Sequence, residues 1–171
     1  MKNIAKVIAA AAIVLGATST SSFAQATATA SASANIITPI TIVKTVDMNF
    51  GNVAVSATTL GTAVLAPGGT RTNTGGVTLP ATTGTVAAAS FTVSGQASYT
   101  YAITLPSTIN ISSGSNTMVV NNFTSLPATT GTLSGTGSQT LNVGATLNVA
   151  AAQASGAYTN ASGVAVTVNY N

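Results

Sequence analysis

Apolar and polar side chains alternate along three stretches of the chain, at residues 98–105, 140–151 and 164–171. A period of two is typical of β-strands, because successive side chains of a strand point to opposite faces of a sheet. In the longest stretch, every odd position from Leu141 to Ala151 is apolar, and the even positions are polar or small. The pattern predicts half-buried strands with one face on a core.

Five further segments are rich in the β-branched and aromatic residues that favour strands. They are residues 40–44, 46–55, 60–65, 85–93 and 117–123. Glycine-rich turn sequences separate the strand candidates, at residues 67–69, 75–76, 113–115 and 135–137. No amphipathic helix with capping residues is visible after residue 26. Many short strands joined by turns predict an all-β fold, an antiparallel β-sandwich.

The first 26 residues have the pattern of a secretory signal peptide. Lys2 and Lys6 precede an apolar run at residues 7–15, and small residues follow as far as Ala24 and Ala26. These features predict export, with cleavage after Ala26 or after Ala24. The run is shorter than the ~20 residues that cross a bilayer as a helix. We therefore expect a protein of the periplasm, the cell surface or the medium, with no transmembrane segment after cleavage.

The composition leaves little side-chain chemistry. The chain has no His, Cys or Trp, and Asp47 is its single acidic residue. One carboxylate cannot form the acid–base pair of a glycosidase or the ligand shell of a metal, and a serine nucleophile would lack a histidine. We expect no enzyme, no metal and no cofactor.

Beyond residue 26 the charged residues are Lys44, Asp47 and Arg71, so the net charge there is 2 minus 1, or +1. Nothing resembles the basic face that binds nucleic acid. The mean hydropathy of +0.50 favours folding over disorder. The lack of cysteine means that no disulfide supports the fold.

Individual residues carry smaller predictions. In an unbroken strand Lys44 and Asp47 would project to opposite faces, so an ion pair between them requires a bulge or a turn. Arg71 is placed in a loop at residues 70–73, as a solubility residue. Gly144 and Gly156 are each interpreted as a bulge or a turn.

Residues 27–38 form an N-terminal arm ahead of a domain at residues 39–171. Small or apolar residues alternate with Thr, Ser and Asn along it. Such an arm buries too little apolar surface to offset an ordering entropy of about 1–2 kcal/mol per residue. It is either an unstructured spacer or a strand that completes another subunit by β-augmentation. The candidate assembly residues are Ala28, Ala30, Ala32, Ala34 and Ile36.

Several segments together resemble the exported bacterial domain-of-unknown-function family 4402. They are residues 39–44, 48–51, 91–95, 101–106, 143–149, 156–158 and 166–171. That family is in turn similar to chaperone–usher pilins and to spore-coat-U-like pilus subunits. The resemblance implies an incomplete immunoglobulin-like sandwich, whose missing strand comes first from a periplasmic chaperone and then from the arm of the next subunit.

Three features match those subunits: the signal peptide, the arm and a terminal strand. The residues of the terminal strand are Val164, Val166, Val168 and Tyr170. Two features depart from them. The pilin disulfide is absent, and Ala is small for pockets that usually take larger side chains.

These observations predict a non-enzymatic structural or adhesive surface protein, a pilin-like subunit that self-associates or joins other surface subunits by β-strand addition. The alternative is a secreted carbohydrate-binding or adhesin domain that acts as a monomer. Such sites stack sugars on Trp or Tyr. Because Tyr99 and Tyr101 share a face with Ile103 and Leu105, we expect both tyrosines in the core instead.

Overall fold

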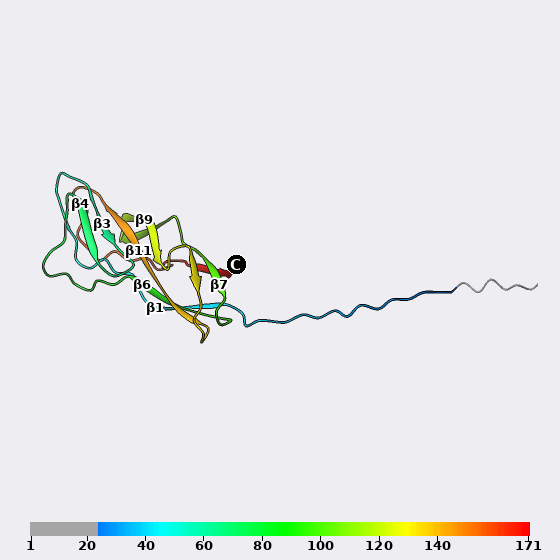
Figure 1. Cartoon of the computed structure of the whole chain (residues 1–171). Helices are drawn as coiled ribbons and strands as arrows, with labels where there is room; N and C mark the ends of the chain where they lie inside the picture. Colours follow the sequence, from blue (N-terminus) through cyan, green and yellow to red (C-terminus); the bar gives the residue numbers. More distant parts are fainter. Residues whose placement is uncertain (1–23) are drawn as a thin grey trace, which may run out of the picture. The chain divides into compact units, whose positions relative to one another are not determined.

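The computed structural model describes residues 24–171 (Figure 1). The chain divides into a unit that ends at Asn35 and a compact unit, Ile36–Asn171. In the first unit, residues 24–35 contain no helix or strand and are exposed throughout. The second unit is all-β, and no residue that the structure describes is helical.

The strands of the second unit are mostly short, and glycine-containing turns connect several of them. They are β1 (Thr41–Val46), β2 (Ala54–Val55), β3 (Gly61–Leu65), β4 (Arg71–Gly75), β5 (Val77–Thr78), β6 (Ala89–Ser94), β7 (Thr100–Thr104), β8 (Thr108–Ser113), β9 (Asn116–Leu126), β10 (Thr130–Thr132), β11 (Ser138–Val149) and β12 (Thr167–Tyr170).

The long strand β11 organises the larger sheet. Its first half pairs with β6 and its second half with β3, both antiparallel. β9 pairs with β11 across this junction, so β9 lies on the opposite edge of β11. β1 extends the sheet beyond β6, β4 extends it beyond β3, and β8 extends it beyond β9. Its hydrogen-bonded order therefore includes the run β1-β6-β11-β9.

A smaller sheet has the order β10-β7-β12, and a two-stranded sheet joins β2 to β5. Tyr101 of β7, Leu133 and Val168 of β12 pack against Phe91 of β6 and Leu141 of β11 in one core cluster. The small sheet thus covers one half of the large sheet. The predicted all-β antiparallel sandwich is confirmed.

The strand order matches an immunoglobulin-like sandwich. In that fold one sheet has the order A-B-E-D and the other contains C, F and G. In chain order β1, β6, β11 and β9 take the places of A, B, E and D, while β7 and β12 take those of C and F. The additional strands β2 to β5 lie between A and B.

A second core cluster lies around the other half of β11. Ala63, Val120, Leu147 and Val149 are buried in it, and partly buried side chains surround them. The partly buried set is Met48, Phe50, Val53, Leu79, Ile109, Ile111, Met118 and Phe123. Fewer residues are buried in this cluster than in the first.

Some predicted strand boundaries are wrong. Residues 46–55 do not form one strand: β1 ends at Val46, Asn49 makes only an isolated bridge to Ala87, and β2 is two residues long. Gly51, with φ of 66°, turns the chain within this segment. The strand expected at residues 85–93 begins only at Ala89.

The prediction for Arg71 is also wrong. It begins strand β4, and its guanidinium donates hydrogen bonds to the carbonyl oxygens of Phe50 and, at 3.0 Å, of Asn52. Arg71 therefore holds the segment that follows β1. The turn at residues 67–69 does connect β3 to β4, and the turn at residues 113–115 connects β8 to β9, as predicted.

Two predictions on single residues are confirmed. The pairing of β1 with β6 shifts register between Lys44 and Val46, and this bulge brings the Lys44 Nζ to 2.6 Å from the Asp47 carboxylate. The pairing of β11 with β9 shifts register between Gly144 and Thr146. A Cβ on Gly144 would overlap the Leu65 carbonyl oxygen, so only glycine fits at this bulge.

Candidate functional site

The two sheets end in edges that no other strand of the described chain covers. β12 pairs with β7 along one edge only, and β1 pairs with β6 along one edge only. β1 and β12 are close neighbours. We call these two uncovered edges, Thr41–Val46 and Thr167–Tyr170, the open seam. In an immunoglobulin sandwich, strand G occupies the equivalent place beside strand F.

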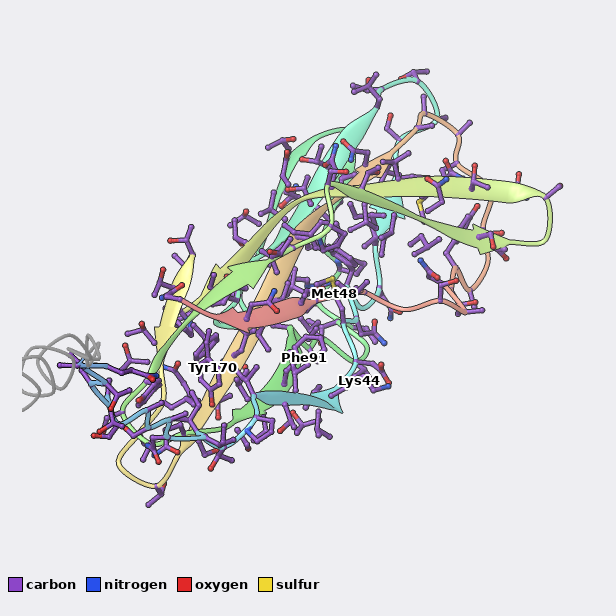
Figure 2. The ribbon with its side chains drawn as sticks, turned by 90° about the vertical axis from the view of Figure 1, so that its right-hand side faces the viewer. Lys44, Met48, Phe91 and Tyr170 are labelled. Carbon is purple, nitrogen blue, oxygen red and sulfur yellow. The ribbon has the colours of Figure 1, made fainter. Side chains whose placement is uncertain are left out.

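Apolar side chains lie along the seam. Ile42 of β1 is half-buried and Val168 of β12 is buried, and both pack against the first core cluster. Figure 2 shows Phe91 between β12, in red, and β1, with Met48 beside one end of β12. Outward from the seam, Val43 is 62% exposed. An edge of this kind resembles the sites where proteins accept an added strand.

A cavity of about 960 Å³ adjoins one end of the seam. Its lining includes Asp47 and Met48, directly after β1, and Gly163 and Val164, shortly before β12. Strands β8, β9 and β11 and the segment at residues 153–160 complete it. The apolar part of its lining includes Met48, Phe50, Ile111, Met118, Leu147 and Val149.

Hydrogen bonds fix two walls of the cavity. Arg71 holds one wall through the carbonyl groups of Phe50 and Asn52. The other wall is attached to β8, because Ser112 and Thr159 exchange two backbone hydrogen bonds of 2.8 and 2.9 Å. The cavity is therefore bounded by segments that are tied to the sheets.

Tyr170 is the centre of a hydrogen-bonded cluster at the other end of the seam. Its hydroxyl donates to the Thr38 carbonyl oxygen at 2.7 Å and accepts from the Gln96 N–H at 2.6 Å. The Thr38 N–H donates to Gln96 Oε1 at 3.3 Å. The Tyr99 ring packs edge-on against Tyr170, with centroids 5.8 Å apart. This cluster fixes the point at which the chain enters the compact unit.

The predicted assembly residues of the arm are all exposed. Ala28, Ala30, Ala32 and Ala34 lie within residues 24–35, which contain no helix or strand. Ile36, at the start of the compact unit, is 90% exposed. Residues 28–36 of the arm thus pair with no strand and present one large apolar side chain to solvent.

The predicted terminal-strand residues fall into two pairs. Val168 and Tyr170 lie on β12 and face inward, whereas Val164 and Val166 precede the strand. Both earlier valines are half-buried, so the alternation of burial extends beyond the hydrogen-bonded part. Val166 joins the first core cluster, and Val164 lines the cavity.

The prediction for the two tyrosines is right for one and wrong for the other. Tyr101 is fully buried and donates a 2.7 Å hydrogen bond to Gln139 Oε1, and burial raises the pKa of its phenol. Tyr99 is 44% exposed. It precedes β7 and follows Ser98, which has φ of 64°, so the alternation does not hold at its position.

The sequence did not predict that Gln96 and Thr38 form hydrogen bonds with Tyr170. It also did not predict that Met48 lines a cavity. Gln96 follows β6 and is the first residue of the turn at residues 96–99, where no periodic pattern marks it. Met48, Asn49 and Phe50 alternate between apolar and polar as in a strand. For this reason the segment was predicted to be a strand and not an irregular connection. The glycine at position 51 was the available signal for a break.

The signal peptide expected at residues 1–26 lies almost entirely outside the described residues. From residue 24 onward, the structure contains no helix that is long and apolar enough to span a bilayer.

A family model described as "Domain of unknown function (DUF4402)" matches residues 40–170. The match covers most of the chain and nearly all of the compact unit, so the chain belongs to this family. No curated protein and no solved structure matches the chain.

Proposed function

We propose that this member of the DUF4402 family is a non-enzymatic surface subunit, in which the arm of one copy completes the sandwich of the next. The observation that carries the proposal is the open seam. The place of strand G beside β12 is uncovered in the described chain, while residues 27–35 of the arm have no partner strand. One molecule thus has both a donor segment and an acceptor edge.

Backbone hydrogen bonds supply the first part of the interaction. Strand addition pairs the N–H and C=O groups of the arm with those of an exposed sheet edge. A strand pair is specific only where one face is buried, because a slip by one residue exchanges the two faces. Here the small residues Ala28 to Ala34 occupy one face of the arm, and Thr and Ser the other. The seam offers an apolar face on which the alanines can pack.

The sparse charge supports self-association. Beyond residue 26 the chain has only Lys44, Asp47 and Arg71, and the first two form an ion pair. Surface charge normally keeps sheet edges apart. A protein whose edges are covered by copies of itself does not need that protection. Export to the periplasm or cell surface, with a periplasmic chaperone that covers the seam before assembly, is part of the proposal.

The arm can be tested by deletion. Purified protein from the periplasm or the cell surface is compared with a variant that lacks residues 27–36, by electrophoresis without and with boiling. We expect ladders in unboiled samples of the intact protein and a monomer for the variant. The deleted residues are exposed, so the variant should keep its fold.

A matched pair of substitutions tests the face of the arm. Ala32→Arg places a charge on the alanine face, whereas Ser31→Arg places the same charge on the opposite face. We expect Ala32→Arg to abolish the ladders and Ser31→Arg to retain them. Ladders that persist without residues 27–36, or equal effects of the two arginines, would contradict the proposal.

The alternative function is carbohydrate binding by a monomer. One observation favours it, the 44% exposure of Tyr99. Its neighbours are Ser98 and Thr100 rather than the asparagines that commonly accompany a sugar platform. A monomer that is unaffected by removal of the arm would favour this alternative.

A further inference from the structure

We infer that the cavity next to Met48 and Val164 receives the Ile36 side chain of a second copy, so that the donated arm runs antiparallel to β12. The inference rests on the proposed function. It adds which residue is the anchor, in which direction the arm runs and which residues face each other.

The cavity suits a neutral, apolar group. Leu147 and Val149 are buried at its base, and Met48, Phe50 and Met118 are half-buried around them. The lining includes two methionines, Met48 and Met118, and methionine adapts readily to the shape of an incoming side chain. Among the described residues of the lining only Asp47 is charged, and its carboxylate is paired with Lys44.

Two polar side chains of the cavity lining, Gln153 and Tyr158, are hydrogen-bonded within the chain. Gln153 Nε2 donates to the Tyr158 hydroxyl at 2.8 Å, and that hydroxyl donates to the Ala154 carbonyl oxygen at 2.8 Å. No buried side-chain nitrogen or oxygen of the described residues lacks a partner. An incoming group therefore gains by burying apolar surface and not by making a required polar contact.

Ile36 is the side chain of the arm that matches this chemistry. Residues 24–35 are Ala, Gln, Thr, Ser and Asn only, without a charge or a large apolar group. Ile36 follows them and is 90% exposed. The Ile36 side chain is exposed to water in the free subunit. Its burial in a cavity of another copy should raise the affinity between the two copies on the order of tenfold or more.

The Ile36 of the same copy cannot reach the cavity. Thr38 is held by Tyr170, at the end of β12, and Figure 2 places Tyr170 and Met48 toward opposite ends of that strand. Six residues separate Tyr170 from Val164, or about 20 Å of extended chain. Ile36 lies two residues from Thr38 and extends at most ~7 Å from it. The occupant must therefore come from a second molecule.

The location of the cavity sets the direction of the arm. It adjoins the segment before β12, so the end of the arm that carries Ile36 must lie there and the rest of the arm must run toward Tyr170. This is the antiparallel arrangement, which is also the commoner one. A parallel arm would bring Ile36 to Tyr170, where a Cβ on Gly95 would already overlap the tyrosine hydroxyl.

The register follows from the same contact. With Ile36 opposite Val164, antiparallel pairing places Ala34 opposite Val166, Ala32 opposite Val168 and Ala30 opposite Tyr170. Residues directly opposite each other in such a pair share a face. The three alanines then lie opposite the residues of the terminal strand whose side chains pack in the first core cluster. Ile36 lies opposite Val164, which lines the cavity. A shift by two residues would keep the alanine face but move Ile36 out of the cavity.

Cysteine pairs can test direction and register. The chain has no cysteine, so a disulfide can form only between introduced thiols. Two singly substituted proteins are mixed, assembled and oxidised, and the disulfide-linked dimer is measured on a non-reducing gel. Opposed strand residues lie within the Cα separation that a disulfide requires. We expect the Ile36→Cys protein to cross-link to the Val164→Cys protein.

The matched pair is Ala30→Cys with Val164→Cys. In the parallel arrangement Ala30 would lie opposite Val164, whereas in the antiparallel register it lies six residues away. We expect little dimer from this mixture. Two results would overturn the inference and leave the proposed function standing. One is a strong cross-link in this mixture, and the other is no cross-link between Ile36→Cys and Val164→Cys while arm-dependent ladders persist.

The anchor itself is tested by Ile36→Ala. Because Ile36 is exposed in the free subunit, the substitution should leave thermal unfolding of the unassembled protein unchanged. The concentration for half-assembly should rise about tenfold or more, and Ile36→Val should raise it less. An unchanged concentration for Ile36→Ala would contradict an anchoring role. Ladders that are independent of residues 27–36 would instead contradict the proposed function.

Discussion

Tyr170 joins three segments that are far apart in the sequence. Its hydroxyl contacts Thr38, where the chain enters the compact unit, and Gln96, in the turn after β6. Its ring packs against Tyr99. Tyr170, the last residue of β12, therefore stabilises the C-terminal end of the arm at Thr38. This hydrogen bond connects the arm to the open seam of the same molecule.

Removal of this hydroxyl should destabilise the compact unit. Tyr170→Phe deletes two hydrogen bonds and leaves the Gln96 N–H and the Thr38 carbonyl without that partner. At about 1 kcal/mol for each bond, the free energy of unfolding should fall by about 1–3 kcal/mol. This loss is measured by urea unfolding, with Tyr170→Phe introduced into the variant that lacks residues 27–36, so that assembly does not contribute. Tyr99→Phe is the control and should cost less than about 0.5 kcal/mol, since no hydrogen bond of the described residues involves its hydroxyl; equal losses would contradict the role of Tyr170.

At the residue scale, the sequence was informative where a geometric rule applied. The bulge that joins Lys44 to Asp47 follows from the opposite directions of side chains three residues apart in a strand. The predictions for Arg71 and Tyr99 were wrong because the environments of these two residues depend on long-range packing. Arg71 contacts a segment some twenty residues earlier, and a residue with positive φ reorients the chain before Tyr99.

At the level of elements, β11 depends on Gly144. The strand passes from pairing with β6 to pairing with β3 at this residue, and its pairing with β9 shifts register there. The Leu65 carbonyl group lies where a Cβ would be. A single glycine thus allows one strand to serve both halves of the core.

Gly144→Ala should therefore be strongly destabilising, by about 1–3 kcal/mol or more, because the backbone of β3 must move. Gly135→Ala is the matched control, since a Cβ there meets nothing within 4 Å. It should change stability by no more than about 1 kcal/mol and can be stabilising. Thermal or urea unfolding of the arm-deleted protein compares them. Similar stabilities of the two variants would show that the bulge tolerates a side chain.

The strands that could be predicted are those with a regular apolar pattern. The alternation at residues 140–151 predicted β11 within two residues, and residues 117–123 lie within β9. β4, β8 and β10 were missed because Thr, Asn, Ser and Gly dominate them. Short polar strands are formed by pairing with their neighbours, and a local pattern does not reveal that pairing.

At the scale of the whole molecule, the sandwich is one strand short of an immunoglobulin domain within residues 24–171. Alternation predicted the fold class and the inward-facing residues of the last strand. It could not predict the open seam or the cavity, because both depend on which strands pair. The charge-poor composition fits a molecule whose edges are covered by other copies.

The central claim is that the seam binds the arm as a strand, and peptide titration tests it most directly. A peptide of residues 26–37 is titrated into the variant that lacks residues 27–36 in a calorimeter, alongside a permuted peptide of identical composition in which the alternation is lost. We predict saturable one-to-one binding of the native peptide and a higher unfolding temperature of the complex, with neither effect for the permuted peptide. Absence of binding, or equal binding of the two peptides, would contradict the account.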